Sequence, residues 1–215
     1  QLFRYIIIVV LPFPNTLLSF IKEKMKTKIL RPSDYVQNEW SGGTTSQIFI
    51  YPDGASLSER DFYFRISSAG IETETSDFSE FEGYNRFFTP LNSGVELTSN
   101  GSAPKKINPL ELFHFDGASE TSAVRKCIDF NLIYKKSLKA NLTVATYSKT
   151  EIVKYTPFPS SEFILIYCWS GAFEVREQTI QPGETFLIQN CPVDVELLIT
   201  KNSTLLISEL SFKKD

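Results

Sequence analysis

The 215-residue chain has the length of one large β domain or of two small, closely packed ones. Hydrophobic residues make up 42 % of the sequence and charged residues 22 %, which is typical of a globular protein with a substantial core. The formal net charge is −3 and no block of Lys and Arg occurs, so the composition argues against a nucleic-acid partner. The 18 Phe and 9 Tyr favour strands over helices.

The N-terminal segment carries a short apolar stretch, residues 5–11, that prolines interrupt. It is too short for a membrane-spanning helix, which needs about 20 residues. A signal peptide is the alternative, but only Arg4 precedes the stretch and no small-residue cleavage site follows it. Met25 is the only methionine, and regular domain-like sequence starts immediately after it. We therefore expect residues 1–24 to be an upstream extension, and we expect no membrane partner.

From Met25 onward, short apolar or alternating runs recur between turn-forming residues. The predicted strands cover residues 45–51, 61–69, 84–91, 94–98, 111–115, 141–147, 163–169, 172–176, 184–189, 193–200 and 203–210. The predicted turns between them include Pro52-Asp53-Gly54, Asn92-Ser93-Gly94, Asn100-Gly101, Ser170-Gly171 and Gln181-Pro182-Gly183. Many short strands separated by turns predict a sandwich or a barrel.

The second half of the chain resembles a cupin-type double-stranded β-helix. A hairpin that turns at Ser170-Gly171 is followed by the corner Gln181-Pro182-Gly183-Glu184 and a further strand. Because the first half has a similar rhythm, we predict an all-β bicupin of two jelly-roll modules. Residues 25–135 form the first module in this interpretation and residues 136–215 the second. Charges and weak helical spacing over residues 119–140 predict a short helix that joins them.

The chain contains one histidine, His114. Metal-binding cupins use two or three His and a Glu, so a metal site of that kind is not expected. Strand alternation in Phe113-His114-Phe115 places His114 opposite the two Phe, which favours a surface or edge histidine over a metal ligand or a general base. No glycine fingerprint for a phosphate or a dinucleotide is present. We expect no metal, no cofactor and no catalytic triad.

The cysteines are Cys127, Cys168 and Cys191. Their odd number and wide spacing do not fit a disulfide framework, and no CxxC pair exists for a zinc ribbon. We therefore expect reduced, partly buried thiols in a cytoplasmic protein.

A first candidate site lies where Trp40 precedes two glycines and several hydroxyl residues. Glycine permits close backbone approach and hydroxyls supply hydrogen-bond donors, so Gly42, Gly43 and Thr44 could cradle a small anion. The alternative is a tight loop that leads into the first strand.

A second candidate is the strand that contains Arg65 and Ser67, which alternation places on one face. The planar guanidinium can bind a carboxylate through two hydrogen bonds. The alternative is an arginine on the solvated face or in a structural ion pair.

Two further candidates are polar. Arg86 follows Glu82 and Asp77, and an ion pair with either is the favoured interpretation over a ligand contact. Asp129 and Asn131 alternate with apolar residues and so point the same way, either to line a pocket or to cap a turn.

Taken in order, these stretches resemble the HutD/Ves family. The family patterns W-x-G-G-x-T, F-x-W-R-I-S-x-A, F-S-x-F-x-G-x-x-R, F-x-G and D-x-N correspond here to Trp40–Thr45, Phe62–Ala69, Phe78–Arg86, Phe115–Gly117 and Asp129–Asn131. The specific resemblance covers residues 29–134, and the second half matches only as a generic cupin module. The chain departs from the patterns at several positions: Phe64 replaces the usual Trp, and Glu39 and Glu82 each replace a Pro.

The resemblance implies a bicupin without a demonstrated enzyme activity. HutD-type members are associated with histidine utilisation and are thought to bind a pathway intermediate as a regulator or governor, and Ves-type members are linked to stress responses. We accordingly expect a metal-independent protein that binds a small carboxylate, such as a formylated amino-acid catabolite. Arg65 would clamp the carboxylate, the hydroxyls of Ser67 and Thr44 and the glycine backbone would add hydrogen bonds, and Trp40 would wall the pocket.

Three alternatives stay open at this point. One is a metal-independent isomerase or lyase, whose acid or base would be Glu96, Asp129 or Tyr84. Another is an interaction module with filled barrels, and the third is a stress-related protein without a ligand. A homodimer is a further expectation, since cupin barrels often pair.

Overall fold

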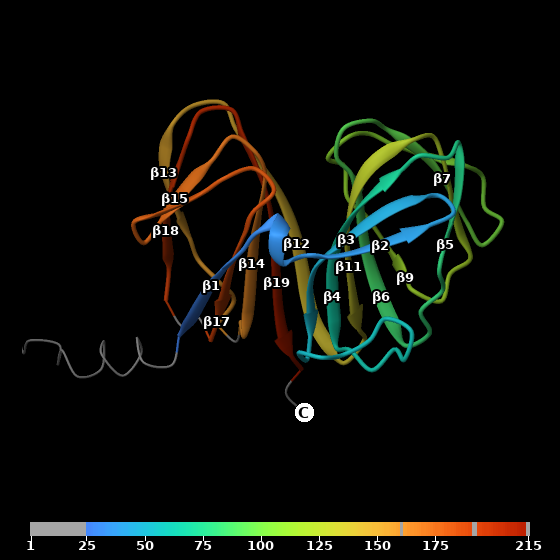
Figure 1. The fold of residues 1–215 in the computed structure, drawn as a ribbon, viewed down its shortest axis with the longest axis horizontal. Coiled ribbons are helices and arrows are strands. Elements are labelled where there is room, and N and C mark those ends of the chain that lie inside the picture. The colour runs from blue at the N-terminus through green and yellow to red at the C-terminus, as the bar shows by residue number, and fades with distance from the viewer. Residues whose placement is uncertain (1–24, 160, 191–192, 214–215) are drawn as a thin grey trace, which may run out of the picture.

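The computed structural model describes residues 25–159, 161–190 and 193–213. These residues form two β modules that lie side by side, the first on the right of Figure 1 and the second on the left. The expected N-terminal extension and Cys191 lie outside the described residues. No helix in the described part of the chain is long and apolar enough to cross a membrane.

The first module packs a six-stranded sheet, in the order β2-β3-β4-β11-β6-β9, against a four-stranded sheet, in the order β5-β10-β7-β8. Its strands are β2 (Val36–Trp40), β3 (Gly43–Tyr51), β4 (Phe64–Ile71), β5 (Thr75–Phe78), β6 (Tyr84–Pro90), β7 (Val95–Ser99), β8 (Lys105–Ile107), β9 (Phe113–Asp116), β10 (Thr121–Val124) and β11 (Cys127–Lys135). The strand pairs within both sheets are antiparallel.

The second module packs a five-stranded sheet, in the order β1-β17-β14-β19-β12, against a four-stranded sheet, in the order β13-β18-β15-β16. Its strands are β1 (Lys26–Leu30), β12 (Leu138–Tyr147), β13 (Glu151–Tyr155), β14 (Phe163–Ser170), β15 (Phe173–Val175), β16 (Gln178–Ile180), β17 (Thr185–Gln189), β18 (Val195–Ile199) and β19 (Ser203–Phe212).

Strand β1 belongs to the five-stranded sheet of the second module, whereas the predicted boundaries assign its residues to the first module. It precedes the first module in sequence but pairs antiparallel with β17 of the second. A short 3₁₀ helix, η1 (Pro32–Asp34), then leads the chain back toward the first module. Just after it, the hydroxyl of Tyr35 donates a hydrogen bond of 2.6 Å to the carbonyl oxygen of Gly183. The first residues after Met25 therefore belong with the second module.

Each predicted strand overlaps an observed one, but the helix predicted over residues 119–140 is wrong. That segment forms β10 (Thr121–Val124), β11 (Cys127–Lys135) and the start of β12. Strand β11 lies at the centre of the six-stranded sheet, paired with β4 on one side and β6 on the other. Its inward polar residues alternate with apolar residues at period two, and this pattern defines the strand.

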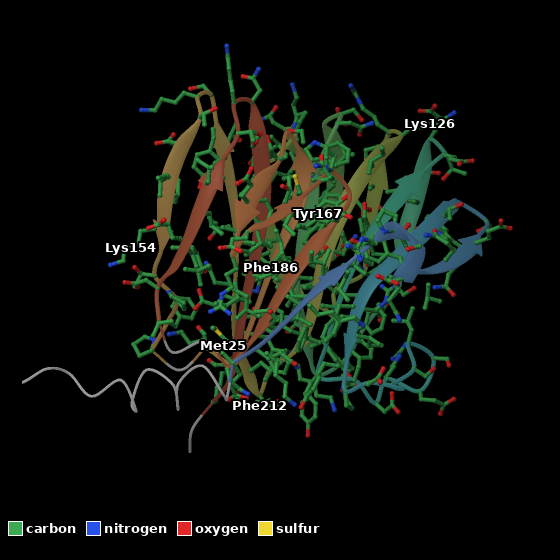
Figure 2. The ribbon with its side chains drawn as sticks, turned by 60° about the vertical axis from the view of Figure 1, so that its left-hand side comes forward. Met25, Lys126, Lys154, Tyr167, Phe186 and Phe212 are labelled. Atoms are coloured by element: carbon green, nitrogen blue, oxygen red, sulfur yellow. The ribbon has the colours of Figure 1, made fainter. Side chains whose placement is uncertain are left out.

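The two large sheets share an apolar layer that holds the modules together. Strand β11 contributes Phe130 and Leu132 to this layer, and β14 contributes Leu165 and Tyr167. The rings of Phe130 and Tyr167 lie 5.3 Å apart, centroid to centroid. Tyr167 is labelled in Figure 2, as is Phe186, which belongs to the separate core inside the second module. Each central strand thus presents one face to the shared layer and the other to the interior of its own module.

Candidate anion-binding cavity

The interior of the first module holds a cavity of about 270 Å³. Its floor is the inward face of the six-stranded sheet, and strand β5, the segment after it and a side chain from the β3–β4 connection line its other sides. The lining residues are Asn38, Trp40, Thr45, Leu57, Arg65, Ser67, Ala69, Ile71, Ser76, Asp77, Phe78, Ser79, Phe81, Arg86, Asp129, Asn131 and Ile133.

Two arginines rise from the floor of this cavity. In the register of the sheet, Ile133 of β11 lies opposite Arg65 of β4 and also opposite Arg86 of β6, so the arginines flank it. Arg65 is 5 % exposed and Arg86 is 8 % exposed. Strand alternation turns these side chains inward, because Phe64 and Ile66, the neighbours of Arg65, are fully buried in the layer between the modules.

Neutral side chains accept hydrogen bonds from some of the guanidinium nitrogens of each arginine. Arg65 donates from Nε to Gln47 Oε1 at 2.8 Å and from Nη1 to Ser67 Oγ at 3.0 Å. Arg86 donates from Nε to Asn131 Oδ1 at 2.8 Å, and its guanidinium carbon lies 4.4 Å from the ring centre of Phe78. These contacts fix the positions of both groups while Nη2 of Arg65 and both Nη atoms of Arg86 make no hydrogen bond to any described residue.

Neither arginine forms an ion pair within 4.0 Å among the residues that the structure describes. The predicted pair of Arg86 with Glu82 or Asp77 is therefore wrong. Its neutral partners Asn131 and Phe78 leave its charge uncompensated at short range. The solvated-face and ion-pair alternatives for Arg65 do not describe it either, because its side chain is buried against Gln47 and Ser67.

The nearest buried carboxylate is Asp129, which is 2 % exposed and shares the inward face of β11 with Asn131. Its Oδ1 accepts two hydrogen bonds, from the backbone N–H of Ala69 at 3.2 Å and from Nδ2 of Asn131 at 2.6 Å. Of the two interpretations of Asp129 and Asn131, the structure places both in the lining of a pocket. A chain of hydrogen bonds thus runs from Arg86 through Asn131 to Asp129.

Burial perturbs all three charged groups. Loss of water raises the pKa of Asp129 to about 7, although Arg86 and the two hydrogen bonds to Oδ1 oppose that rise. Loss of water also lowers the pKa of Arg65 and of Arg86 to about 10 each, with the attraction of Asp129 acting in the other direction. Among the buried groups of the lining, two guanidinium groups face one carboxylate, because the other lining carboxylate, Asp77, is exposed to solvent.

Trp40 lies at the cavity, 38 % exposed, at the end of β2. The adjacent residues Gly42 and Gly43 allow close contacts that a side chain at either position would block, and neither residue lines the cavity. A Cβ on Gly42 would lie 2.0 Å from Cζ3 of Trp40, and a Cβ on Gly43 would lie 1.9 Å from the carbonyl oxygen of Gly70. Thr44 likewise lies outside the lining, since it is paired within the sheet between β2 and β4 and its neighbour Thr45 points inward instead. The tight turn into β3, the alternative to an anion cradle, accounts for these three residues.

Sequence reasoning missed Phe78, which lines the cavity, and Gln47, which holds Arg65 without lining the cavity itself. Both position arginines: Gln47 accepts from Arg65 and Phe78 underlies Arg86. Period-two alternation does place Thr45 and Gln47 on one face of the predicted strand 45–51. Which face is internal could not be read from that pattern, because the strand contains a bulge after Gln47.

The other candidate acids and bases have structural roles. His114 is exposed, with Nε2 2.9 Å from the hydroxyl of Tyr134. Tyr84 donates its hydroxyl to backbone carbonyls at 2.7 Å, and Glu96 pairs with Arg125 at 3.7 Å on the surface. Among the described residues, no three side chains of His, Cys, Asp or Glu converge in a way that could hold a metal ion. Asp129 is the one of the proposed acids and bases that lines the cavity.

Comparison with known proteins gives the same fold and one family. The model of the HutD family matches residues 32–207 of the chain. No curated protein sequence matches it.

Solved structures extend the comparison over most of the chain. HutD from Pseudomonas fluorescens SBW25 is 24 % identical, with a TM-score of 0.72 over 88 % of this chain and 100 % of that one. The conserved protein of unknown function PA5104 from Pseudomonas aeruginosa PAO1 is also 24 % identical, with a TM-score of 0.72 over 86 % and 99 % of the two chains. The bacterial pirin YhhW from Escherichia coli, in complex with nickel(II), is 10 % identical, with a TM-score of 0.69 over 87 % and 100 %. The predicted all-β cupin-type fold is thereby confirmed.

Proposed function

The chain belongs to the HutD family, and on that premise we propose that it is a metal-independent protein that binds a small carboxylate in the cavity of its first module. The observation that carries the proposal is the pair of buried guanidinium groups, Arg65 and Arg86, which face one buried carboxylate, Asp129, in the cavity lining. Their unused Nη donors supply the hydrogen bonds that a carboxylate accepts.

The energetic argument follows from burial. A buried charge without a close partner is costly, and a bound anion removes that cost by supplying the missing partner. The rest of the lining suits a small organic acid, because apolar and aromatic side chains such as Ile71, Phe81 and Trp40 accompany the polar groups. The volume of about 270 Å³ sets the scale of the ligand as an amino-acid catabolite or smaller.

We propose further that binding serves regulation and not turnover, in connection with histidine or other amino-acid catabolism, as the HutD resemblance implies. The Pseudomonas fluorescens HutD structure is described as a formate condition, and formate is the smallest carboxylate. A ligand panel for this chain should therefore run from formate through dicarboxylates to formylated and plain intermediates of histidine degradation.

Thermal unfolding with this panel tests the proposal. A ligand that binds only the folded protein stabilises it by about 2.7 kcal/mol at a hundredfold excess over Kd. We expect at least one carboxylate to raise the melting temperature of the wild type and not that of Arg65→Met. Arg125→Met is the matched control, because it removes an exposed arginine outside the cavity, and it should keep the full shift. Equal shifts in wild type and Arg65→Met, or none with any ligand, would contradict the proposal.

A second function is favoured by one observation. Asp129 combines a pKa of about 7 with a position in the cavity, which suits a general acid or base in a metal-independent isomerase or lyase. NMR of each bound ligand during prolonged incubation distinguishes the two functions. An unchanged ligand supports binding alone, whereas conversion that Asp129→Asn abolishes, with binding retained, supports the enzyme.

A further inference from the structure

The hydrogen bonds around Asp129 determine which of its oxygens can carry a proton. Arg86 has only donors, so its bond to Asn131 fixes Oδ1 of that amide as the acceptor and leaves Nδ2 to donate to Asp129. Oδ1 of Asp129 therefore faces two N–H donors, from Asn131 and from the backbone of Ala69. A proton on Asp129 must then reside on Oδ2, which makes no hydrogen bond with any described residue.

The titratable groups around Asp129 lie on four strands. Arg65 on β4 and Arg86 on β6 attract its charged form, and Cys127 on its own strand shares its inward face. Burial raises the pKa of Cys127 to about 12, so that thiol stays neutral near physiological pH. Asp77 on β5 also lines the cavity but is exposed. With Asp129 ionised, the buried groups carry one net positive charge.

Because the buried groups carry one net positive charge, a ligand with one negative charge and a ligand with two affect the cavity differently. A monoanion neutralises the cavity with Asp129 ionised, and Oδ2 of Asp129 can then accept a hydrogen bond from an N–H or O–H of the ligand. A dianion leaves one excess negative charge and places a second carboxylate in the same cavity as Asp129. Three carboxylates then face two guanidinium groups, so one carboxylate lacks a cationic partner and shares a proton with its neighbour.

Resting on the proposed binding of carboxylates, we infer that a dicarboxylate binds with uptake of one proton on Oδ2 of Asp129, whereas a monocarboxylate that carries a hydrogen-bond donor binds without it. Asp129 thus makes the affinity for dicarboxylates, and not for monocarboxylates, respond to pH. The carboxylic acid formed at Oδ2 donates to the second carboxylate of the ligand.

Isothermal titration calorimetry on the full chain tests this inference with succinate and its monoamide succinamate, which differ by one charge at nearly the same shape. At about pH 8, Tris and HEPES differ in ionisation enthalpy, so the two buffers together give the number of protons taken up. We expect close to one proton for succinate and close to none for succinamate. The Kd of succinate should rise about tenfold per pH unit above about pH 8, while that of succinamate should stay nearly constant.

Two variants assign the proton to one residue. Asp129→Asn should bind succinate without proton uptake and without that dependence on pH. Glu96→Gln, which removes a surface carboxylate outside the cavity, should behave as the wild type. Equal proton uptake by the two ligands in the wild type overturns the inference and leaves carboxylate binding intact. Binding of neither ligand overturns the inference and counts against carboxylate binding as well. The wild-type comparison decides the question even if a variant fails to fold.

Discussion

The two modules share a sheet architecture but fill it with opposite chemistry. The central strands of the first module turn Arg65, Ser67 and Asp129 inward, around a cavity. The central strands of the second turn Ile166 and Leu205 inward, into a core of apolar side chains. The fold itself therefore does not specify a site, and the identity of a few inward residues decides whether a module encloses a polar cavity or an apolar core.

The second module also contains a buried carboxylate, Glu209, which differs from Asp129 in its hydrogen-bond donors. Glu209 is 2 % exposed, and its two oxygens accept hydrogen bonds from the hydroxyl of Tyr155, the backbone N–H of Phe158 and the hydroxyl of Ser161. The protein itself supplies these donors, so Glu209 fixes a loop. Among the described residues, donors reach Asp129 on Oδ1 alone, so its Oδ2 is left without a protein partner there.

The largest expected effect is on the second module. Phe186→Ala should lower the free energy of unfolding by about 3–5 kcal/mol, because a fully buried ring leaves a cavity in a close-packed core. Ser67→Ala in the first module should cost only about 1 kcal/mol, since it removes one hydrogen bond beside an existing cavity. Urea denaturation of both variants measures the two losses of unfolding free energy. Similar losses would contradict the contrast between a close-packed second module and a first module with a cavity.

Glu209→Ala should lower the free energy of unfolding by about 2–3 kcal/mol, because three protein donors lose their acceptor. Carboxylate affinity should not change, since Glu209 lies in the other module. Urea denaturation and ligand titration on the same preparation check both statements. Weaker carboxylate binding in this variant would show that the modules are coupled.

Asp129→Asn should change how stability depends on pH. The folded state raises the pKa of Asp129 from 3.8 to about 7, so the stability this group contributes is fully present below about pH 4 and is lost as the pH rises to about 7. The wild type should therefore lose stability across this range relative to Asp129→Asn, by at most about 1.4 kcal/mol per pH unit. Parallel stability curves for the two proteins, from urea denaturation at each pH, would contradict the raised pKa.

The smallest expected effect concerns the edge of the cavity. Gly42→Ala should displace the indole of Trp40, which lies against Gly42, and weaken carboxylate binding by about 1 kcal/mol or less, since only a rim contact is lost. Gly70→Ala is the matched control, because a Cβ there meets nothing within 4 Å. Ligand titration followed by fluorescence compares the two. Equal carboxylate affinities of the two variants would show that Trp40 does not contact the bound ligand.

The sequence by itself determined the strands and the family. Alternation predicted that Arg65 and Ser67 share a face and that Asp129 and Asn131 point the same way, and the structure agrees because the period of a strand leaves only two faces. The ordered motifs indicated HutD, and the family model confirms it. The helix predicted over residues 119–140 failed because its charges gave weak helical spacing to what is a central strand.

Only the tertiary structure decided which strand faces lie together and which partners the arginine side chains find there. Pairing of β11 with both β4 and β6 sets Arg65 and Arg86 on either side of Ile133, and no local pattern encodes pairing between strands so far apart in sequence. The same pairing gave Arg86 neutral partners in place of the acidic neighbours that its local sequence offers. The charge of the cavity is a property of residues brought together across the sheet, because electrostatic energy depends on distance and burial and not on order along the chain.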